Sequence, residues 1–68
     1  PNYEDYLLQV FSNPLSSIVK IADLIHNLSH NPSPRQIEKY KSALKNVPPP
    51  TYLKASLTEE LFSILSQL

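Results

Sequence analysis

The chain contains no cysteine, no glycine, no methionine and no tryptophan among its 68 residues. Without cysteine it can form neither a disulfide bond nor a thiolate metal site. Without glycine it cannot build the Gly-rich loop that cradles phosphate groups in many nucleotide-binding proteins. Because natural reading frames start with methionine and this chain opens at Pro1, we expect it to be a piece of a longer protein.

An excess of charge of one sign and long apolar runs are also lacking. Six basic residues balance six acidic ones, so no overall field attracts nucleic acid or a membrane, and neither partner is expected. No apolar run reaches the roughly 20 residues of a membrane span, and no signal peptide is recognisable. We therefore expect a cytoplasmic protein that forms one domain, near the lower size limit for a self-sufficient core.

Proline and capping residues predict where the first two helices begin and end. Asn2 is a suitable N-cap for a first amphipathic helix, which should stop at the sequence Ser12-Asn13-Pro14. Asn13 can then cap a central helix over residues 14–29, with Pro14 at its first position, where the missing N–H costs nothing.

Two further helices are predicted in the second half of the chain. Ser33 and Gln36 form a capping box that opens a helix over 34–46. Three consecutive prolines end it and start a connector over 48–56, within which 51–55 is ambiguous. Ser56 and Glu59 suggest a second capping box and a terminal helix over 57–68. The fold class is therefore all-α, a single helical domain with a small bundle of about four short helices.

The central helix is the most apolar part of the chain, and it also carries an unusual set of polar residues. Lys20, Asp23 and Asn27 recur at steps of three and four, so they share one polar stripe with Ser16 and His30. A helix that is apolar around most of its circumference should be largely buried, and a buried Asp needs a cation, a metal or hydrogen bonds. The expected core side consists of Leu15, Ile18, Val19, Ala22, Ile25 and Leu28.

Four motifs over residues 3–47 together resemble the later half of HD-superfamily phosphohydrolases, in particular the branch that hydrolyses the alarmone guanosine tetraphosphate. The resemblance covers about two-thirds of the chain. The motifs are Tyr3-x-x-Tyr6, Asn13-Pro-Leu, Val19-Lys-Ile-Ala-Asp-Leu-Ile-His-Asn-Leu28 and Glu38-Lys-Tyr-x-x-Ala-Leu44.

The resemblance implies a divalent metal, often manganese, which this family holds with a His, a His-Asp pair and a later Asp. Asp23 matches the later Asp, and Asn27 matches an Asn that orients water or a nucleotide phosphate beside the metal. Such a cation prefers carboxylate oxygen and imidazole, and it lowers the pKa of bound water. The first His and the His-Asp pair have no counterpart in these 68 residues, so the chain alone is not expected to hydrolyse anything.

Simpler interpretations stand beside the enzymatic one. Asp23 could be paired with Lys20 or His26, or simply solvated, and His26 is more typical of a partly buried packing residue than of a ligand. The basic residues Arg35, Lys39, Lys41 and Lys45 are more typical of a solvated face than of a phosphate site. The alternative function is a non-catalytic helical interaction module. Its apolar terminal helix would bind another protein chain or a second copy.

Overall fold

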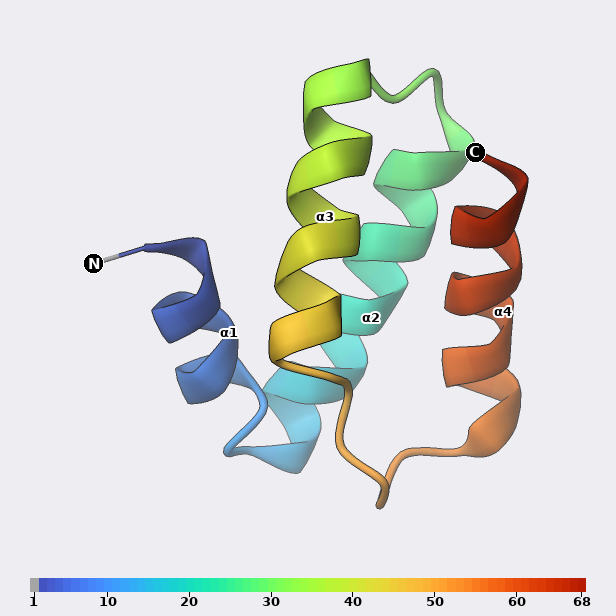
Figure 1. The fold of residues 1–68 in the computed structure, drawn as a ribbon. Coiled ribbons are helices and arrows are strands. Elements are labelled where there is room, and N and C mark those ends of the chain that lie inside the picture. The colour runs from blue at the N-terminus through green and yellow to red at the C-terminus, as the bar shows by residue number, and fades with distance from the viewer. Residues whose placement is uncertain (1) are drawn as a thin grey trace.

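The structure, a computed structural model, describes residues 2–68 and consists of four helices joined by short connections. They are α1 (Tyr3–Val10), α2 (Pro14–Ser29), α3 (Pro34–Asn46) and α4 (Ala55–Gln67) (Figure 1). No strand occurs in the described residues, which confirms the predicted all-α bundle. The expected ranges of α2 and α3 agree with the structure residue for residue. None of the helices within 2–68 is long and apolar enough to cross a membrane.

The predicted caps of the first three helices are present. The Asn2 side chain accepts a hydrogen bond from the backbone N–H of Asp5 at 2.9 Å. Asn13 accepts from the N–H groups of Leu15 and Ser16, with Pro14 directly after it. At the start of α3, Ser33 and Gln36 form both hydrogen bonds of a capping box. Each cap satisfies N–H groups that lack a partner within the helix, so these local sequences determine where the helices begin.

The fourth helix begins differently from the prediction. It starts at Ala55, two residues early, and its N-cap Lys54 makes no side-chain hydrogen bond. Ser56 lies inside the helix, so the capping box expected from Ser56 and Glu59 is wrong. The residue that fixes this end is Leu53, which the turn before the helix places in the core at 8% exposure. Tertiary packing, rather than a local cap, therefore determines where α4 begins.

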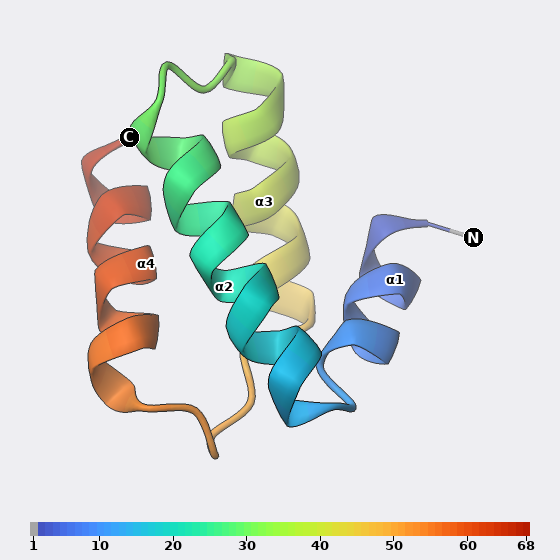
Figure 2. The ribbon, with the colours of Figure 1, turned by 180° about the vertical axis from the view of Figure 1, so that it is seen from behind.

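The helices are arranged around α2. The α4 helix packs chiefly against α2, and the short α1 helix contacts both α2 and α3. Figures 1 and 2 show α1 and α4 on opposite sides of the bundle, with α2 and α3 between them. The side chain of Asn46 at the end of α3 donates a hydrogen bond to Glu4 at 3.0 Å, and this contact ties α1 to α3.

The α2 helix buries a side that coincides only in part with the one predicted. Ile21 and Leu24 are fully buried, whereas Leu15 is 72% exposed and Val19 is 61% exposed. Ile18 and Ala22, also expected in the core, are exposed as well. Leu28 is buried as expected, and Ile25 is partly buried against the core. The prediction was wrong for the other four residues, because α2 is apolar around most of its circumference and its own pattern does not select a side. The small bundle covers only one side, and its core consists of Leu7, Phe11, Ile21, Leu24, Leu28, Tyr40, Ala43, Leu44, Val47, Leu53, Leu61 and Leu65.

Candidate functional site in the groove between α1 and α2

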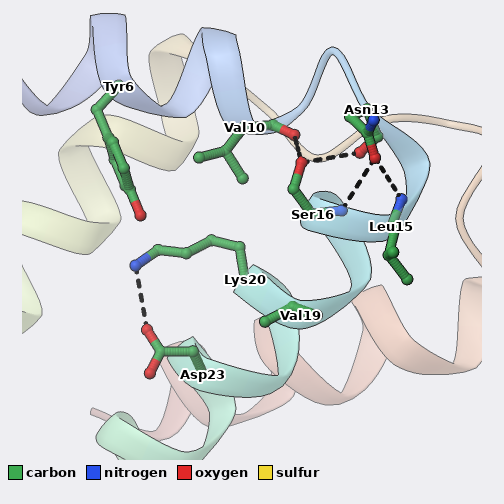
Figure 3. A pocket seen from close by; sticks show the side chains of 8 residues that line it. All are labelled: Tyr6, Val10, Asn13, Leu15, Ser16, Val19, Lys20 and Asp23. Atoms are coloured by element: carbon green, nitrogen blue, oxygen red, sulfur yellow. Dashed lines mark hydrogen bonds and ion pairs between the residues drawn. The ribbon is translucent and has the colours of Figure 1, made fainter.

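An open groove of about 700 Å³ runs between α1 and the first half of α2 (Figure 3). It is partly apolar, and one charged pair lies at its end on α2. Polar and apolar side chains thus meet in one accessible depression, as in many ligand sites. The residues that line it are Tyr6 and Val10 of α1, Asn13 of the turn, and Leu15, Ser16, Val19, Lys20 and Asp23 of α2.

The turn between the two helices fixes the geometry of this groove. The Ser16 hydroxyl donates a hydrogen bond to the carbonyl oxygen of Val10, the last residue of α1. The cap formed by Asn13 holds the start of α2 at the same point. These bonds anchor the first turn of α2 to the end of α1. Lys20 follows one turn after Ser16, and in Figure 3 its side chain extends toward Tyr6.

Lys20 and Asp23 form an ion pair at the rim of the groove. The Nζ atom of Lys20 lies 3.1 Å from a carboxylate oxygen of Asp23. The Lys20 side chain is 15% exposed, and that of Asp23 is 47% exposed. Partial burial acts to lower the pKa of Lys20, but the hydrogen bond to Asp23 and the neighbouring phenol groups raise it above its ordinary value. This outcome agrees with the simpler interpretation, in which Lys20 is the partner of Asp23.

Tyrosine rings surround the Lys20 ammonium on the α1 side. Its Nζ atom lies 5.2 Å from the ring centre of Tyr6 and 5.7 Å from that of Tyr3. Lys39 of α3 approaches the Tyr3 ring as well, at 4.4 Å. The Tyr3 hydroxyl is buried without a hydrogen-bond partner in the described chain, and this burial raises the pKa of Tyr3. Two ammonium groups therefore flank one tyrosine ring, a favourable electrostatic arrangement.

The structure places Asn27 one helical turn beyond Asp23, on the same side of α2. Asn27 is half-buried, and it does not line the groove. Asp23 and Asn27, the two residues expected at the metal site, thus lie on the same side of α2, but only Asp23 lines the groove. The sequence pattern had indicated the shared side, because a spacing of four residues requires it.

His26 differs from the expectation in two ways. It is exposed rather than partly buried, and its ring lies against that of His30, not against the Asp23 carboxylate. The separation of three residues from Asp23 had suggested a hydrogen bond between them, but Asp23 bonds to Lys20 instead. Neither histidine contributes to the groove.

The donor set matches a divalent metal in type but not in number. Asp23 offers the carboxylate oxygen that a hard cation prefers, and its half-exposed side chain is accessible. Within residues 2–68, however, no group of three His, Cys, Asp or Glu side chains is close enough to hold a metal ion. Any complete site would need further ligands from elsewhere.

The place of Tyr6 in this groove could not be predicted from the sequence. Its place in the first-helix pattern gave no sign that its ring faces Lys20 across the α1–α2 turn, because that contact depends on how the two helices pack.

Comparison of the chain with protein-family models, with curated proteins and with solved structures found no match.

Proposed function

We propose that this chain forms part of an HD-type metal-dependent nucleotide phosphohydrolase and is not active alone. In this proposal Asp23 is one metal ligand, and Asn27 positions water or a substrate phosphate. The remaining ligands, a His and a His-Asp pair, come from another segment of the protein. The observation that carries the proposal is the half-exposed Asp23 carboxylate at the rim of the groove, with Asn27 one turn along the same helix. A cytoplasmic location remains part of this proposal.

The chemistry of the neighbouring residues is consistent with this role. A bound manganese ion would supply a water of lowered pKa and would neutralise phosphate charge. Lys20 balances the charge of Asp23 at 3.1 Å, and its ammonium group also suits a phosphate oxygen. The amide of Asn27 can both donate and accept hydrogen bonds, so it can orient either water or phosphate.

The exposed apolar side of α2 supports the idea that another segment completes the site. Leu15 and Val19 line the same groove as Asp23, and both are more than half exposed. Exposed apolar surface of this kind favours contact with further protein. A segment packed on Leu15 and Val19 would lie next to Asp23, where the missing ligands are needed.

The decisive variant is Asp23→Asn in the natural full-length protein. We expect manganese-dependent hydrolysis of guanosine tetraphosphate, followed as released pyrophosphate, to fall to the background rate, because the amide lacks the negative charge that the metal requires. Glu59→Gln is the matched control, since it neutralises an exposed acidic residue of α4 outside the groove. It should leave the rate unchanged.

Two outcomes would reject this proposal. An Asp23→Asn protein with undiminished activity would remove Asp23 from the metal site. A full-length protein that hydrolyses no nucleotide with manganese present would remove the enzymatic function altogether. A loss of activity in Asp23→Asn supports the proposal only where circular dichroism shows that the helical content of the variant is unchanged.

A second candidate function, a helical protein-interaction module, is favoured by the same exposed side of α2. The sequence predicts this binding surface on the terminal helix, where Phe62 is 44% exposed and Leu68 is 47% exposed. The exposed fractions of Leu15 and Val19 are larger, so α2 is the better candidate surface. This function predicts that Val19→Lys abolishes association with the partner while Asp23→Asn preserves it, as measured by sedimentation of the complex.

A further inference from the structure

The exposed side of α2 changes character halfway along the helix. Over the first half it is apolar, and its exposed residues are Leu15, Ile18, Val19 and Ala22. Their steps of three and four place them in one stripe, which becomes polar at His26 and Ser29. We propose that this apolar half of α2 binds a second copy of the chain across a twofold axis. The inference rests on the second candidate function, the interaction module, and names its partner.

The apolar stripe forms a ridge between two hollows. On one side lies the groove against α1, which Tyr6 borders. On the other side, a second hollow of about 500 Å³ lies between α2 and the start of α4, and its lining includes Ile18, Tyr52 and Leu57. Figure 2 shows α2 in front of α3, between α1 and α4. Helices pack by fitting the ridges of one into the grooves of the other, so this side of α2 has the relief that helix packing requires.

The apolar area of this side suits a dimer interface of ordinary size. Tyr6 is 46% exposed and Tyr52 54%, and the exposed fractions of Leu15, Ile18 and Val19 lie between 47% and 72%. These five side chains offer roughly 400 Å² of apolar surface. A standard interface covers about 800 Å² on each partner, and slightly more than half of that area is apolar. Contact of this side with its copy therefore supplies the apolar area that a specific dimer needs.

The order of large and small residues along the stripe favours an antiparallel pair. Leu15, which is 72% exposed, lies at one end of the stripe, and Ala22 lies at the other, two turns along the helix. An antiparallel pair of α2 helices centred on Ile18 and Val19 sets each Leu15 against the Ala22 of the copy, so that a large side chain meets a small one. A parallel pair would set the two alanines against each other, and it would leave a gap there.

The charges beside the stripe allow the same surface to approach its own copy. The groove on the α1 side is lined by one cation and one anion, Lys20 and Asp23. The hollow on the α4 side is likewise lined by Lys54 and Glu60. Each hollow therefore carries no net charge. Because like charges that face each other weaken association, a surface of one sign would repel its copy, whereas this surface does not.

Sedimentation equilibrium of the protein, without metal or nucleotide and over roughly 1 μM to 1 mM, tests this inference. We expect a reversible equilibrium of monomer and dimer with a dissociation constant in the micromolar range. Ile18→Lys should raise this constant by at least about tenfold, because two ammonium groups would then meet at the axis. The matched control is Leu8→Lys, the same kind of change at an α1 residue that is 58% exposed and lines neither hollow. It should leave the constant unchanged.

Disulfide cross-linking tests the antiparallel arrangement, since these 68 residues contain no cysteine of their own. Under mild oxidation, Ile18→Cys should form a cross-linked dimer, because residue 18 lies at the axis. Leu15→Cys alone should not, because its two copies lie roughly 10 Å apart along the paired helices, beyond the reach of a disulfide. A mixture of Leu15→Cys and Ala22→Cys chains should cross-link. Circular dichroism should show unchanged helical content in every variant.

Three results would overturn the inference. A protein that stays monomeric up to the highest concentration excludes the second copy, and an interaction module would then need a different protein as its partner. Equal weakening by Ile18→Lys and Leu8→Lys would place the dimer contact outside the stripe. Cross-linking of Leu15→Cys with itself would reject the antiparallel pair. None of these results bears on the hydrolase proposal, because neither metal nor nucleotide takes part.

Discussion

Replacing Leu24 with alanine is expected to lower the free energy of unfolding by about 2–5 kcal/mol. Leu24 is fully buried on the side of α2 that faces the core, so the change removes apolar contacts and leaves a cavity. Domains typically have about 0.05–0.15 kcal/mol of stability per residue, or roughly 3–10 kcal/mol for a chain of this length. The loss is therefore a large fraction of the total. Urea unfolding followed by circular dichroism measures it.

The matched control is Leu15→Ala, the same substitution on the opposite side of the same helix. Leu15 is 72% exposed, and surface substitutions usually change stability by no more than about 0.5 kcal/mol. Equal losses for the two variants, or a larger loss for Leu15→Ala, would contradict the orientation of α2 in this structure. Because the sequence pattern had assigned Leu15 to the core, this pair of measurements also tests which side α2 buries.

Removing the hydroxyl of Tyr52 is expected to lower the free energy of unfolding by about 1–3 kcal/mol, because two hydrogen bonds worth roughly 0.5–1.5 kcal/mol each are lost. The Tyr52 hydroxyl donates to the carbonyl oxygen of Phe11 at 2.9 Å, and it lies 2.9 Å from the hydroxyl of Ser17. Ser17 is fully buried, and its hydroxyl also bonds to the carbonyl oxygen of Asn13. The hydroxyl of Tyr52 thus joins the connector before α4 to the turn between α1 and α2.

Tyr52→Phe measures this contribution, because it keeps the ring and removes the oxygen. Thermal unfolding should show a clearly lower midpoint than the original protein. Tyr6→Phe should have little effect, because the Tyr6 hydroxyl makes no hydrogen bond in the described chain, whereas that of Tyr52 makes two. A Tyr52→Phe protein as stable as the original would mean that the two hydrogen bonds add nothing net to stability.

The parts of the fold that depend on local chemistry could be predicted from the sequence. Asn13 and Pro14 mark the start of α2, and Ser33 with Gln36 marks the start of α3, because these side chains satisfy backbone groups within a few residues. The solvated face expected from Arg35, Lys39, Lys41 and Lys45 of α3 is also present, since all four residues are exposed.

The parts that depend on distant contacts could not be predicted. Both sides of α2 carry apolar residues. The packing of the neighbouring helices therefore determines that Ile21 and Leu24 are buried. The start of α4 depends on the burial of Leu53 in the core, and no local sequence motif indicates that burial. For the candidate site, the spacing of Lys20 and Asp23 predicted their shared side, while the position of Tyr6 required the packing of α1 on α2.

The attachment of α4 has a consequence for local opening of the molecule. This helix packs chiefly against α2, whereas α1 connects to both α2 and α3. Proteins open locally in cooperative units, so a terminal helix that packs chiefly on one neighbour can detach while the other helices stay in contact. Release of α4 would leave α1, α2 and α3 in contact and would bare a second apolar side of α2. While α4 is detached, the amide hydrogens of α4 would exchange with solvent, and α2 would be accessible to new partners on both sides.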